Sequence, residues 1–159
     1  MQSLRCAPGD LAIYLAAHRS QPRLDLQDVA GFLILACSVA GEAIADTQMR
    51  RFKADHRSQG RICDAGLWGW SRHPNYFFEW LGWVAYPVIA LSVTEPWSLL
   101  SIAAPALMYV ILTRLTGVVL LEAAMVRSKG EIYRDYQRRV PAFFPRPPER
   151  ATRDDGGVT

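Results

Sequence analysis

Trp97-Ser-Leu-Leu-Ser-Ile-Ala-Ala-Pro-Ala-Leu-Met-Tyr-Val-Ile-Leu-Thr-Arg-Leu-Thr-Gly-Val-Val-Leu-Leu121 is an apolar stretch of 25 residues with one charged side chain, Arg114. A helix rises about 1.5 Å per residue, so this stretch is longer than the ~30 Å hydrocarbon core of a bilayer. Pro105 and Gly117 lie inside it, and membrane helices tolerate both residues better than soluble helices do. The sequence therefore predicts that this stretch spans a membrane.

Two other stretches have the composition of membrane spans. Val29 to Ala45 is about the minimum length for a crossing and carries Glu42 near its end. The second stretch runs from Tyr76 to about Thr94. A very short turn, Glu95-Pro96, joins it to the stretch Trp97–Leu121, which is the third along the chain. We therefore expect an all-α, multi-pass transmembrane bundle of about three spans, followed by an amphipathic C-terminal helix on the cytoplasmic side.

The distribution of basic residues predicts the orientation of these spans. The chain has 18 Lys and Arg and 15 Asp and Glu, and the basic residues gather in 46–75 and after residue 121. By the positive-inside rule, the second and third spans form a hairpin with both ends in the cytoplasm. Arg19 and Arg23, which precede the first span, conflict with this orientation but are outnumbered by the two larger basic blocks.

A soluble helical bundle with buried apolar helices is the alternative fold. Charged and apolar residues are segregated along the chain, which favours spans and loops over the alternating faces of a globular core. A net charge of +3 suits nucleic acid, anionic lipid headgroups or a phosphorylated ligand. The five Trp and the apolar stretches favour the last two, so we expect a bilayer and no nucleic acid as partners.

Polar residues are densest in Gly66-Leu-Trp-Gly-Trp-Ser-Arg-His-Pro-Asn-Tyr-Phe-Phe-Glu-Trp80. A proline suits the first turn of a helix, where its missing N–H has no partner to lose. The second span is therefore predicted to begin at Pro74, with Ser71 or His73 near its cap.

The start of this helix carries four candidate functional residues. Asn75 and Glu79 are four apart and share one face, which must turn toward other helices or a cavity because polar groups are costly against lipid. Arg72 and His73 lie at the N-terminal end, where unpaired backbone N–H groups favour a phosphorylated cofactor. The alternative is that Arg72 and His73 contact lipid phosphate, while Asn75 and Glu79 join helices together.

The C-terminal segment holds a second group of candidates. Tyr133 and Tyr136 are three apart on one face of a predicted helix, with Arg139 three further on. Aromatic rings beside guanidinium groups suit the base and phosphates of a nucleotide. An amphipathic helix at the membrane surface, with aromatic anchors and snorkelling arginines, explains the same pattern equally well.

Several other site classes lack their signatures. The cysteines have no CxxC spacing and the histidines are scattered, so no metal site is expected; they are Cys6, Cys37, Cys63, His18, His56 and His73. The chain has no GxGxxG or Walker loop. A nucleotide would therefore bind without a Rossmann fold.

Four stretches together resemble a known family: Asp46-Thr47-Gln48 with Phe52-Lys53, the run 66–80, Thr116-Gly117 to Glu122, and Tyr133 to Pro145. They resemble the DUF1295 family of small bacterial membrane proteins. That family is grouped with the C-terminal domain of steroid 5-alpha-reductases and, more distantly, with sterol reductases and isoprenylcysteine carboxyl methyltransferases. The resemblance covers roughly residues 28–148 and implies a bacterial inner-membrane protein whose cofactor side is cytoplasmic. Residues 1–27 then form a short N-terminal remnant and 149–159 a disordered tail.

The resemblance implies NADPH-dependent reduction of a carbon–carbon double bond conjugated to a ketone. Glu79 would face the substrate carbonyl as an acid. The residues implied to bind the cofactor are Asn75, Arg72, His73, Tyr76, Tyr133, Tyr136 and Arg139. Asp46, Gln48 and Glu122 would support these residues or contact the ribose. The implied substrate is hydrophobic: a steroid, a terpenoid or a fatty enone.

The sequence departs from the family pattern in three places. Relatives usually have Gly where this chain has Phe78, which raises the question whether the ring narrows the cofactor groove. Val140-Pro141 replaces a more usual Thr-Ser. The family normally has several more helices before residue 28, so the chain is expected to be a fragment or to have a misassigned start, and a fragment can be catalytically incomplete alone.

Two other functions are kept beside the reductase. A membrane methyltransferase that uses S-adenosylmethionine is one, because that branch also carries an Arg-His-Pro-x-Tyr element. Glu79 favours the reductase over it, since methyl transfer needs no acid aimed at a ketone. A non-catalytic membrane remnant is the other.

Overall fold

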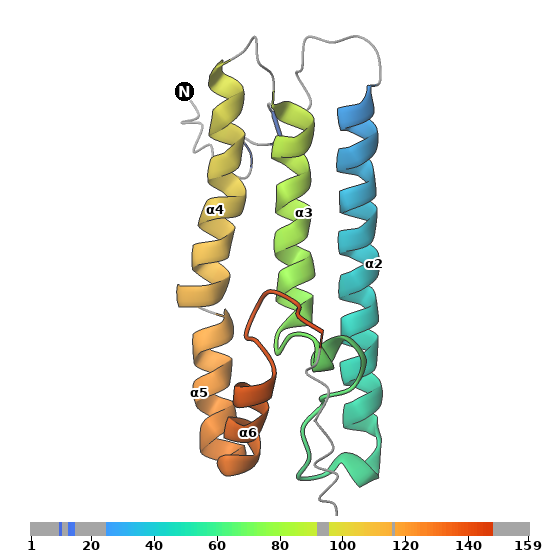
Figure 1. Ribbon diagram of the computed structural model, residues 1–159, viewed down its shortest axis with the longest axis vertical. Coiled ribbons are helices and arrows are strands. Elements are labelled where there is room, and N and C mark those ends of the chain that lie inside the picture. Colours follow the sequence, from blue (N-terminus) through green and yellow to red (C-terminus); the bar gives the residue numbers. More distant parts are fainter. Residues whose placement is uncertain (1–9, 11–12, 15–24, 92–95, 116, 148–159) are drawn as a thin grey trace, which may run out of the picture.

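The computed structural model describes residues 10, 13–14, 25–91, 96–115 and 117–147. Three helical columns run side by side: α2 (Leu26–Ala54), α3 (Pro74–Ala90), and α4 (Ala103–Val110) continued by α5 (Gly117–Lys129) (Figure 1). α6 (Glu131–Arg139) folds back beside α5. All regular elements in these described ranges are helical, which confirms the predicted all-α class. The predicted remnant 1–27 lies mostly outside the described residues, and the predicted tail 149–159 lies wholly outside them.

α2 is longer than the predicted first span because it continues past Ala45 into the basic segment. Its start is fixed by a reciprocal cap. The Asp25 carboxylate accepts the backbone N–H of Gln27 at 2.9 Å, and the Asp28 carboxylate accepts that of Asp25 at 2.9 Å. Arg51 and Lys53 lie in its last turn, where positive charge suits the helix dipole.

α2 and α3 pack along a row of small residues. Gly31, Ser38, Gly41 and Ala45 are the buried residues of α2. A Cβ at Gly31 would lie 2.2 Å from Ile89 Cγ1, and one at Gly41 would lie 2.3 Å from the Phe78 ring. Small residues let two helix backbones approach this closely, as in membrane-helix pairs.

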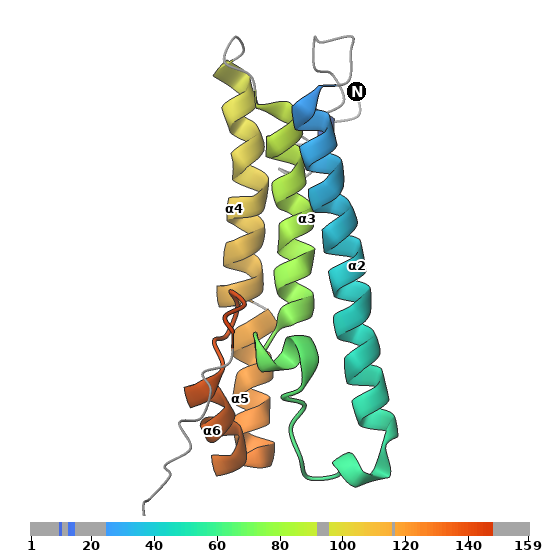
Figure 2. The same ribbon diagram turned by 45° about the vertical axis from the view of Figure 1, so that its right-hand side comes forward.

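α3 begins at Pro74 with His73 as its N-cap residue, as predicted from the proline. The helix has 17 residues and ends at Ala90. Residues 92–95, where the second span was expected to end, lie outside the described residues. α3 lies between α2 and the α4–α5 column in both views (Figure 2).

The predicted third span is not one uninterrupted α-helix. A 3-10 segment, Pro96–Ile102, precedes α4, and a π-helical turn, Ile111–Leu115, precedes α5. Pro105 lies in the first turn of α4, where its lack of an N–H is harmless. Gly117 begins α5 beneath Tyr76, and a Cβ there would lie 2.7 Å from the Tyr76 ring. The π-helical turn between α4 and α5 therefore lies next to the place where the Tyr76 ring of α3 contacts the backbone at Gly117.

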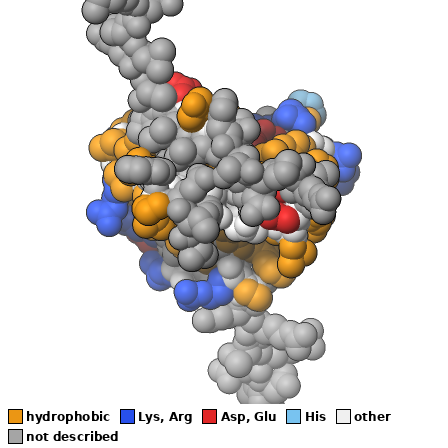
Figure 3. All heavy atoms as spheres, turned by 90° about the horizontal axis from the view of Figure 1, so that it is seen from above, with side chains coloured by type: hydrophobic (Ala, Val, Ile, Leu, Met, Phe, Trp, Pro, Cys, Tyr) orange, Lys and Arg blue, Asp and Glu red, His pale blue; other side chains and the backbone are white. Residues whose placement is uncertain are grey.

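Two helical runs, Leu26–Ala54 and Ser98–Lys129, are long and apolar enough to cross a membrane. In their apolar windows only 22% and 29% of the residues are buried, so their side chains face outward, unlike those of core helices in a soluble bundle. Figure 3, which looks down on the upper end of the bundle, shows hydrophobic side chains at its rim with Lys and Arg side chains between them. These helices indicate a membrane protein and are compatible with a lipid bilayer. A third crossing by α3, the orientation and the bacterial inner membrane stay predictions.

Candidate functional site

A cavity of about 670 Å³ lies at the end of the bundle where α3 begins. Its walls come from the C-terminal half of α2, the segment 55–63 and the residues at the start of α3. Helices α5 and α6 complete the walls. The predicted site residues that line it are Asp46, Arg72, His73, Asn75, Tyr133 and Tyr136. The structure therefore gathers six of the eleven predicted residues around one space.

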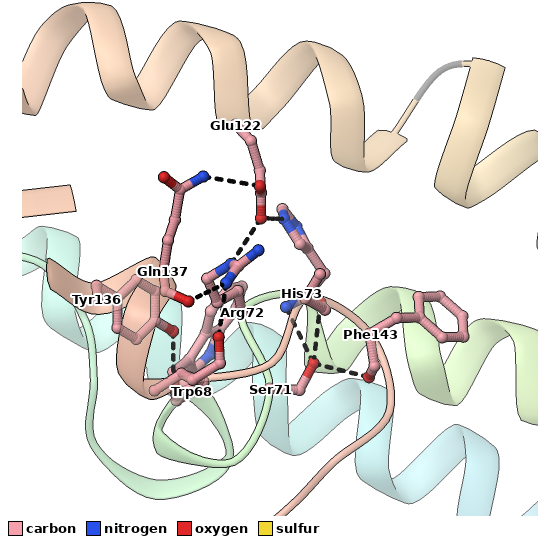
Figure 4. A network of polar contacts seen from close by, with 10 residues as sticks. Trp68, Ser71, Arg72, His73, Glu122, Tyr136, Gln137 and Phe143 are labelled. Carbon is pink, nitrogen blue, oxygen red and sulfur yellow. Dashed lines mark hydrogen bonds and ion pairs between the residues drawn. The ribbon is translucent and has the colours of Figure 1, made fainter. Parts of the chain in front are cut away.

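Glu122 on α5 is the centre of a partly buried polar network beside the cavity (Figure 4). Its Oε1 accepts Arg72 Nε at 2.6 Å and lies 3.3 Å from His73 Nε2, while its Oε2 accepts Gln137 Nε2 at 2.9 Å. The side chains of Arg72 and His73 are 9% and 6% exposed. An ion pair in such a place is expensive to break, because removing one partner leaves a buried charge.

Arg72 also fastens the end of α6. Its Nη1 donates to the carbonyls of Gln137 at 2.8 Å and Val140 at 2.6 Å, and its backbone N–H donates to Pro141 at 2.9 Å. Carbonyls at a helix C-terminus lack intrahelical partners and attract cations. Arg72 thus joins the start of α3 to both α5 and α6, and these protein contacts engage both its Nε and its Nη1.

The segment after α6 runs back along residues 70–73. Ser71 Oγ donates to Phe143 O at 2.9 Å, and the Arg146 N–H donates to Trp70 O at 2.9 Å. Phe143 is buried against Phe77 and Trp80, with ring centroids 6.1 and 5.9 Å away. This C-terminal strap, residues 140–146, therefore holds the Arg72–His73 segment in place from outside.

Tyr133 and Tyr136 lie on the buried face of α6 and line the cavity. The Tyr136 hydroxyl donates to Trp68 O at 2.5 Å. Burial raises the pKa of Tyr133 to about 12, helped by the charge of Glu122, and burial likewise raises the pKa of Tyr136. Both phenols are therefore neutral hydrogen-bond donors at physiological pH.

Arg139 does not share the face of the two tyrosines. Each step of three residues turns a helix by about 300°, so six residues beyond Tyr133 the side chain points elsewhere. Arg139 is 62% exposed, lies 3.6 Å from the Asp64 carboxylate, and is outside the cavity. Arg139 therefore does not lie beside the two tyrosines, and its contact with a cofactor stays a prediction.

Asn75 and Glu79 occupy different levels of α3. Asn75 lines the cavity, and its side chain makes no hydrogen bond to the described residues. Glu79 is one turn further along, within electrostatic reach of Glu42 on α2, and does not line the cavity. The shared face predicted for the pair therefore runs from the cavity toward the apolar part of the bundle.

Two other predicted site residues, Tyr76 and Gln48, do not line the cavity. The Tyr76 ring stacks on His73 at 5.7 Å and covers Gly117, outside the cavity. Gln48 Oε1 accepts the Leu67 N–H at 3.0 Å. Phe78 packs on Gly41 and is not among the residues that line the cavity.

Three basic residues that were not predicted as site residues line the cavity: Lys53, Arg61 and Lys129. They come from α2, the segment 55–63 and α5, so only the folded chain brings them together. Lys53 lies within one of the stretches that carry the family resemblance. Arg61 and Lys129 lie in no such pattern.

The chain is thus a helical protein with two helical runs long and apolar enough to cross a membrane and with a cavity at one end of the bundle that polar and charged side chains help to line. It belongs to the family described as "Protein of unknown function (DUF1295)", whose sequence model matches residues 2–140. An uncharacterized protein of Schizosaccharomyces pombe is 36% identical over 100 residues. That match covers 60% of this chain and 27% of the yeast protein, about a quarter of its length. No solved structure matches the chain.

Proposed function

We propose that the cavity binds NADPH and that the chain reduces a carbon–carbon double bond conjugated to a ketone in a hydrophobic substrate. The observation that carries the proposal is the composition of the cavity. It joins three basic side chains from separate elements with the Asn75 amide and two buried tyrosines.

The cavity fits a nucleotide in size and charge. Ligand sites commonly measure about 300–1,000 Å³, and this one measures about 670 Å³. Lys53, Arg61 and Lys129 would hold the phosphates, since basic side chains pair strongly with phosphate oxygens. The Asn75 side chain has hydrogen-bonding capacity to spare for the ligand, while Arg72, His73 and Glu122 keep the start of α3 in position.

NADPH would supply the hydride that adds to the β carbon. Glu79 would deliver the proton to the ketone oxygen, and the enol so formed would tautomerise to the saturated ketone. Glu79 lies one helical turn, about 6 Å along the axis, beyond Asn75. That place is between the cavity and the apolar helices, where a hydrophobic substrate would enter from the bilayer. A steroid, a terpenoid or a fatty enone would each combine a hydrophobic body with a double bond conjugated to a ketone.

A methyltransferase using S-adenosylmethionine is the second candidate. The methyl donor carries a positive sulfonium group. The lining of the cavity holds four basic residues, Lys53, Arg61, Arg72 and Lys129, against two carboxylates, Asp46 and Asp55, so its net positive charge would repel that group. The charge of the cavity therefore favours NADPH. A non-catalytic remnant would bind neither compound.

Ligand binding tests the proposal directly. Detergent-solubilised protein is titrated with NADPH and, separately, with S-adenosylmethionine, and fluorescence and thermal midpoint are recorded. We expect NADPH alone to stabilise the protein. Lys53→Gln with Arg61→Gln should weaken NADPH binding about tenfold or more, the scale of charged hydrogen bonds lost. Stabilisation by the methyl donor alone would overturn the reductase, and binding of neither compound would favour the remnant.

Arg50→Gln with Arg57→Gln is the matched control. Both arginines are exposed and lie outside the cavity lining, so the pair removes the same charge without touching the site. Equal losses in the two double variants would mean that NADPH responds only to overall charge.

The proton donor has its own test. Glu79→Gln should keep NADPH affinity and lose NADPH-dependent reduction of enones, because the amide cannot donate an acidic proton. Full activity in this variant would remove Glu79 from the mechanism.

A further inference from the structure

A smaller hollow of about 300 Å³ lies between the segment before α3 and the C-terminal end of α6. Trp70, Arg138, Arg139 and Asp64 are among the residues that line it. None of these four residues lines the larger cavity. The hollow is therefore a separate surface feature.

We propose that this hollow binds the phosphate of an anionic phospholipid in the surrounding membrane. The proposal reassigns Arg139, which the family resemblance gave to the cofactor, to the lipid headgroup. It does not depend on what the larger cavity binds.

The two arginines are available to a phosphate. Their side chains are 64% and 62% exposed, and their partners are the surface carboxylates of Asp135 and Asp64. Exposed ion pairs of this kind contribute little free energy, so a phosphate can replace either carboxylate. Guanidinium groups match phosphate oxygens in geometry and form paired hydrogen bonds with them.

The aromatic residues nearby place the hollow at the level of lipid headgroups. Trp70 is 45% exposed, and tryptophan is enriched where acyl chains meet headgroups. Phe144 is 51% exposed and packs on Trp80 of α3 and Tyr109 of α4, with ring centroids 5.5 and 5.9 Å away. Exposed rings against the apolar helices, then Trp70, then the two arginines follow the order from acyl chains to headgroups.

This order is the reason to choose a lipid over a soluble phosphate. A soluble phosphate needs the arginines alone, whereas a lipid also uses the exposed Trp70 and Phe144. The C-terminal strap connects these groups, since the Arg146 N–H donates to Trp70 O at 2.9 Å.

Native mass spectrometry of the detergent-solubilised chain tests the proposal. The protein is titrated with phosphatidylglycerol or phosphatidylcholine carrying identical acyl chains, and bound lipids are counted. We expect phosphatidylglycerol to bind about tenfold more tightly, the effect of two basic residues near an anionic headgroup. Arg138→Gln with Arg139→Gln should abolish this preference and leave NADPH affinity unchanged. Trp70→Leu should weaken binding of both lipids.

Two controls keep the outcomes distinct. Arg50→Gln with Arg51→Gln removes the same charge from the exposed end of α2 and should keep the preference. Arg138→Lys with Arg139→Lys keeps the charge and should restore part of the preference for phosphatidylglycerol. This lysine variant also tests the proposal if the glutamine variant does not fold. Equal binding of the two lipids by the unaltered chain, or an unchanged preference in the glutamine variant, would overturn the proposal. Competition by millimolar glycerophosphoglycerol as effective as the intact lipid would assign the hollow to a soluble phosphate instead.

Discussion

The two ends of α3 are held by different kinds of contact. At its start, Arg72 and His73 are bound by polar groups from α5 and α6, and nearly every bond joins residues far apart in the sequence. Further along, α3 rests on Gly31 and Gly41 of α2, where the contact needs only the absence of a side chain. The contacts at the start of α3 require every polar group to keep its hydrogen-bond or ion-pair partner. The contacts with α2 require the space that the missing glycine side chains leave. The candidate site lies at the start of α3.

The largest effect is expected where a buried partner is removed. Arg72→Ala leaves the Glu122 carboxylate, which is only 17% exposed, with His73 and the Gln137 amide but without its strongest cationic partner, and losing one member of a buried ion pair costs about 3–5 kcal/mol. We expect a thermal midpoint in detergent lowered by many degrees, or loss of the folded protein. Replacing both partners, Arg72→Met with Glu122→Leu, should recover much of the stability because no unpaired charge remains. A single variant as stable as the unaltered chain would contradict the description of this network.

The glycine contacts predict a smaller effect of a different kind. Gly41→Ala places a methyl group 2.3 Å from the Phe78 ring, so the ring or the helix must move, at a cost of about 1–3 kcal/mol. The stability of the variant is measured by thermal unfolding in the same detergent.

Phe78→Ala combined with Gly41→Ala separates crowding from helix propensity. The loss of stability in the double variant should be smaller than the sum of the losses in the single variants, because Phe78→Ala removes the ring with which the Gly41→Ala methyl group clashes. Additive losses would mean that the ring and the glycine do not touch.

The residues around the candidate site differ in how well the sequence predicted them. The start of α3 at Pro74 was predictable because a proline acts locally on its own backbone. The buried pair Tyr133 and Tyr136 was predictable from helix periodicity. Arg61 and Lys129 were missed because their shared cavity requires the chain to fold back on itself, and no short pattern reports that. Arg72 borders the cavity, but no sequence pattern predicted that its Nε and Nη1 donate to Glu122 and to the end of α6.

High pH should weaken the region around the cavity. The pKa of Tyr133 is raised to about 12 in the folded chain, whereas an unfolded tyrosine titrates near ~10. The stabilisation is present below pH ~10 and is lost as pH rises toward 12, because the unfolded state gives up its proton first. We expect Tyr133 to contribute about 1 kcal/mol per pH unit of this loss.

Tyr133→Phe provides the comparison. It cannot ionise, so its stability relative to the unaltered chain should improve between pH 9 and pH 11 when unfolding is measured at both values. An identical pH dependence in the two proteins would mean that Tyr133 is accessible to solvent and free to ionise when folded.

The smallest effect is expected at Arg139, although it is an arginine in an ion pair like Arg72. Its partner Asp64 is 3.6 Å away, and the two side chains are 62% and 50% exposed, so water solvates either charge when the other is removed. Exposed pairs contribute about 0–1 kcal/mol, and Arg139→Ala should shift the thermal midpoint by a few degrees at most, measured in detergent without added lipid. Addition of phosphatidylglycerol should then stabilise the unaltered chain more than the variant, because the lost guanidinium matters only when a phosphate is present to meet it. A destabilisation as large as that of Arg72→Ala would show that Arg139 holds α6 in place. Arg139 would then be a structural residue like Arg72 and not an exposed contact for a ligand.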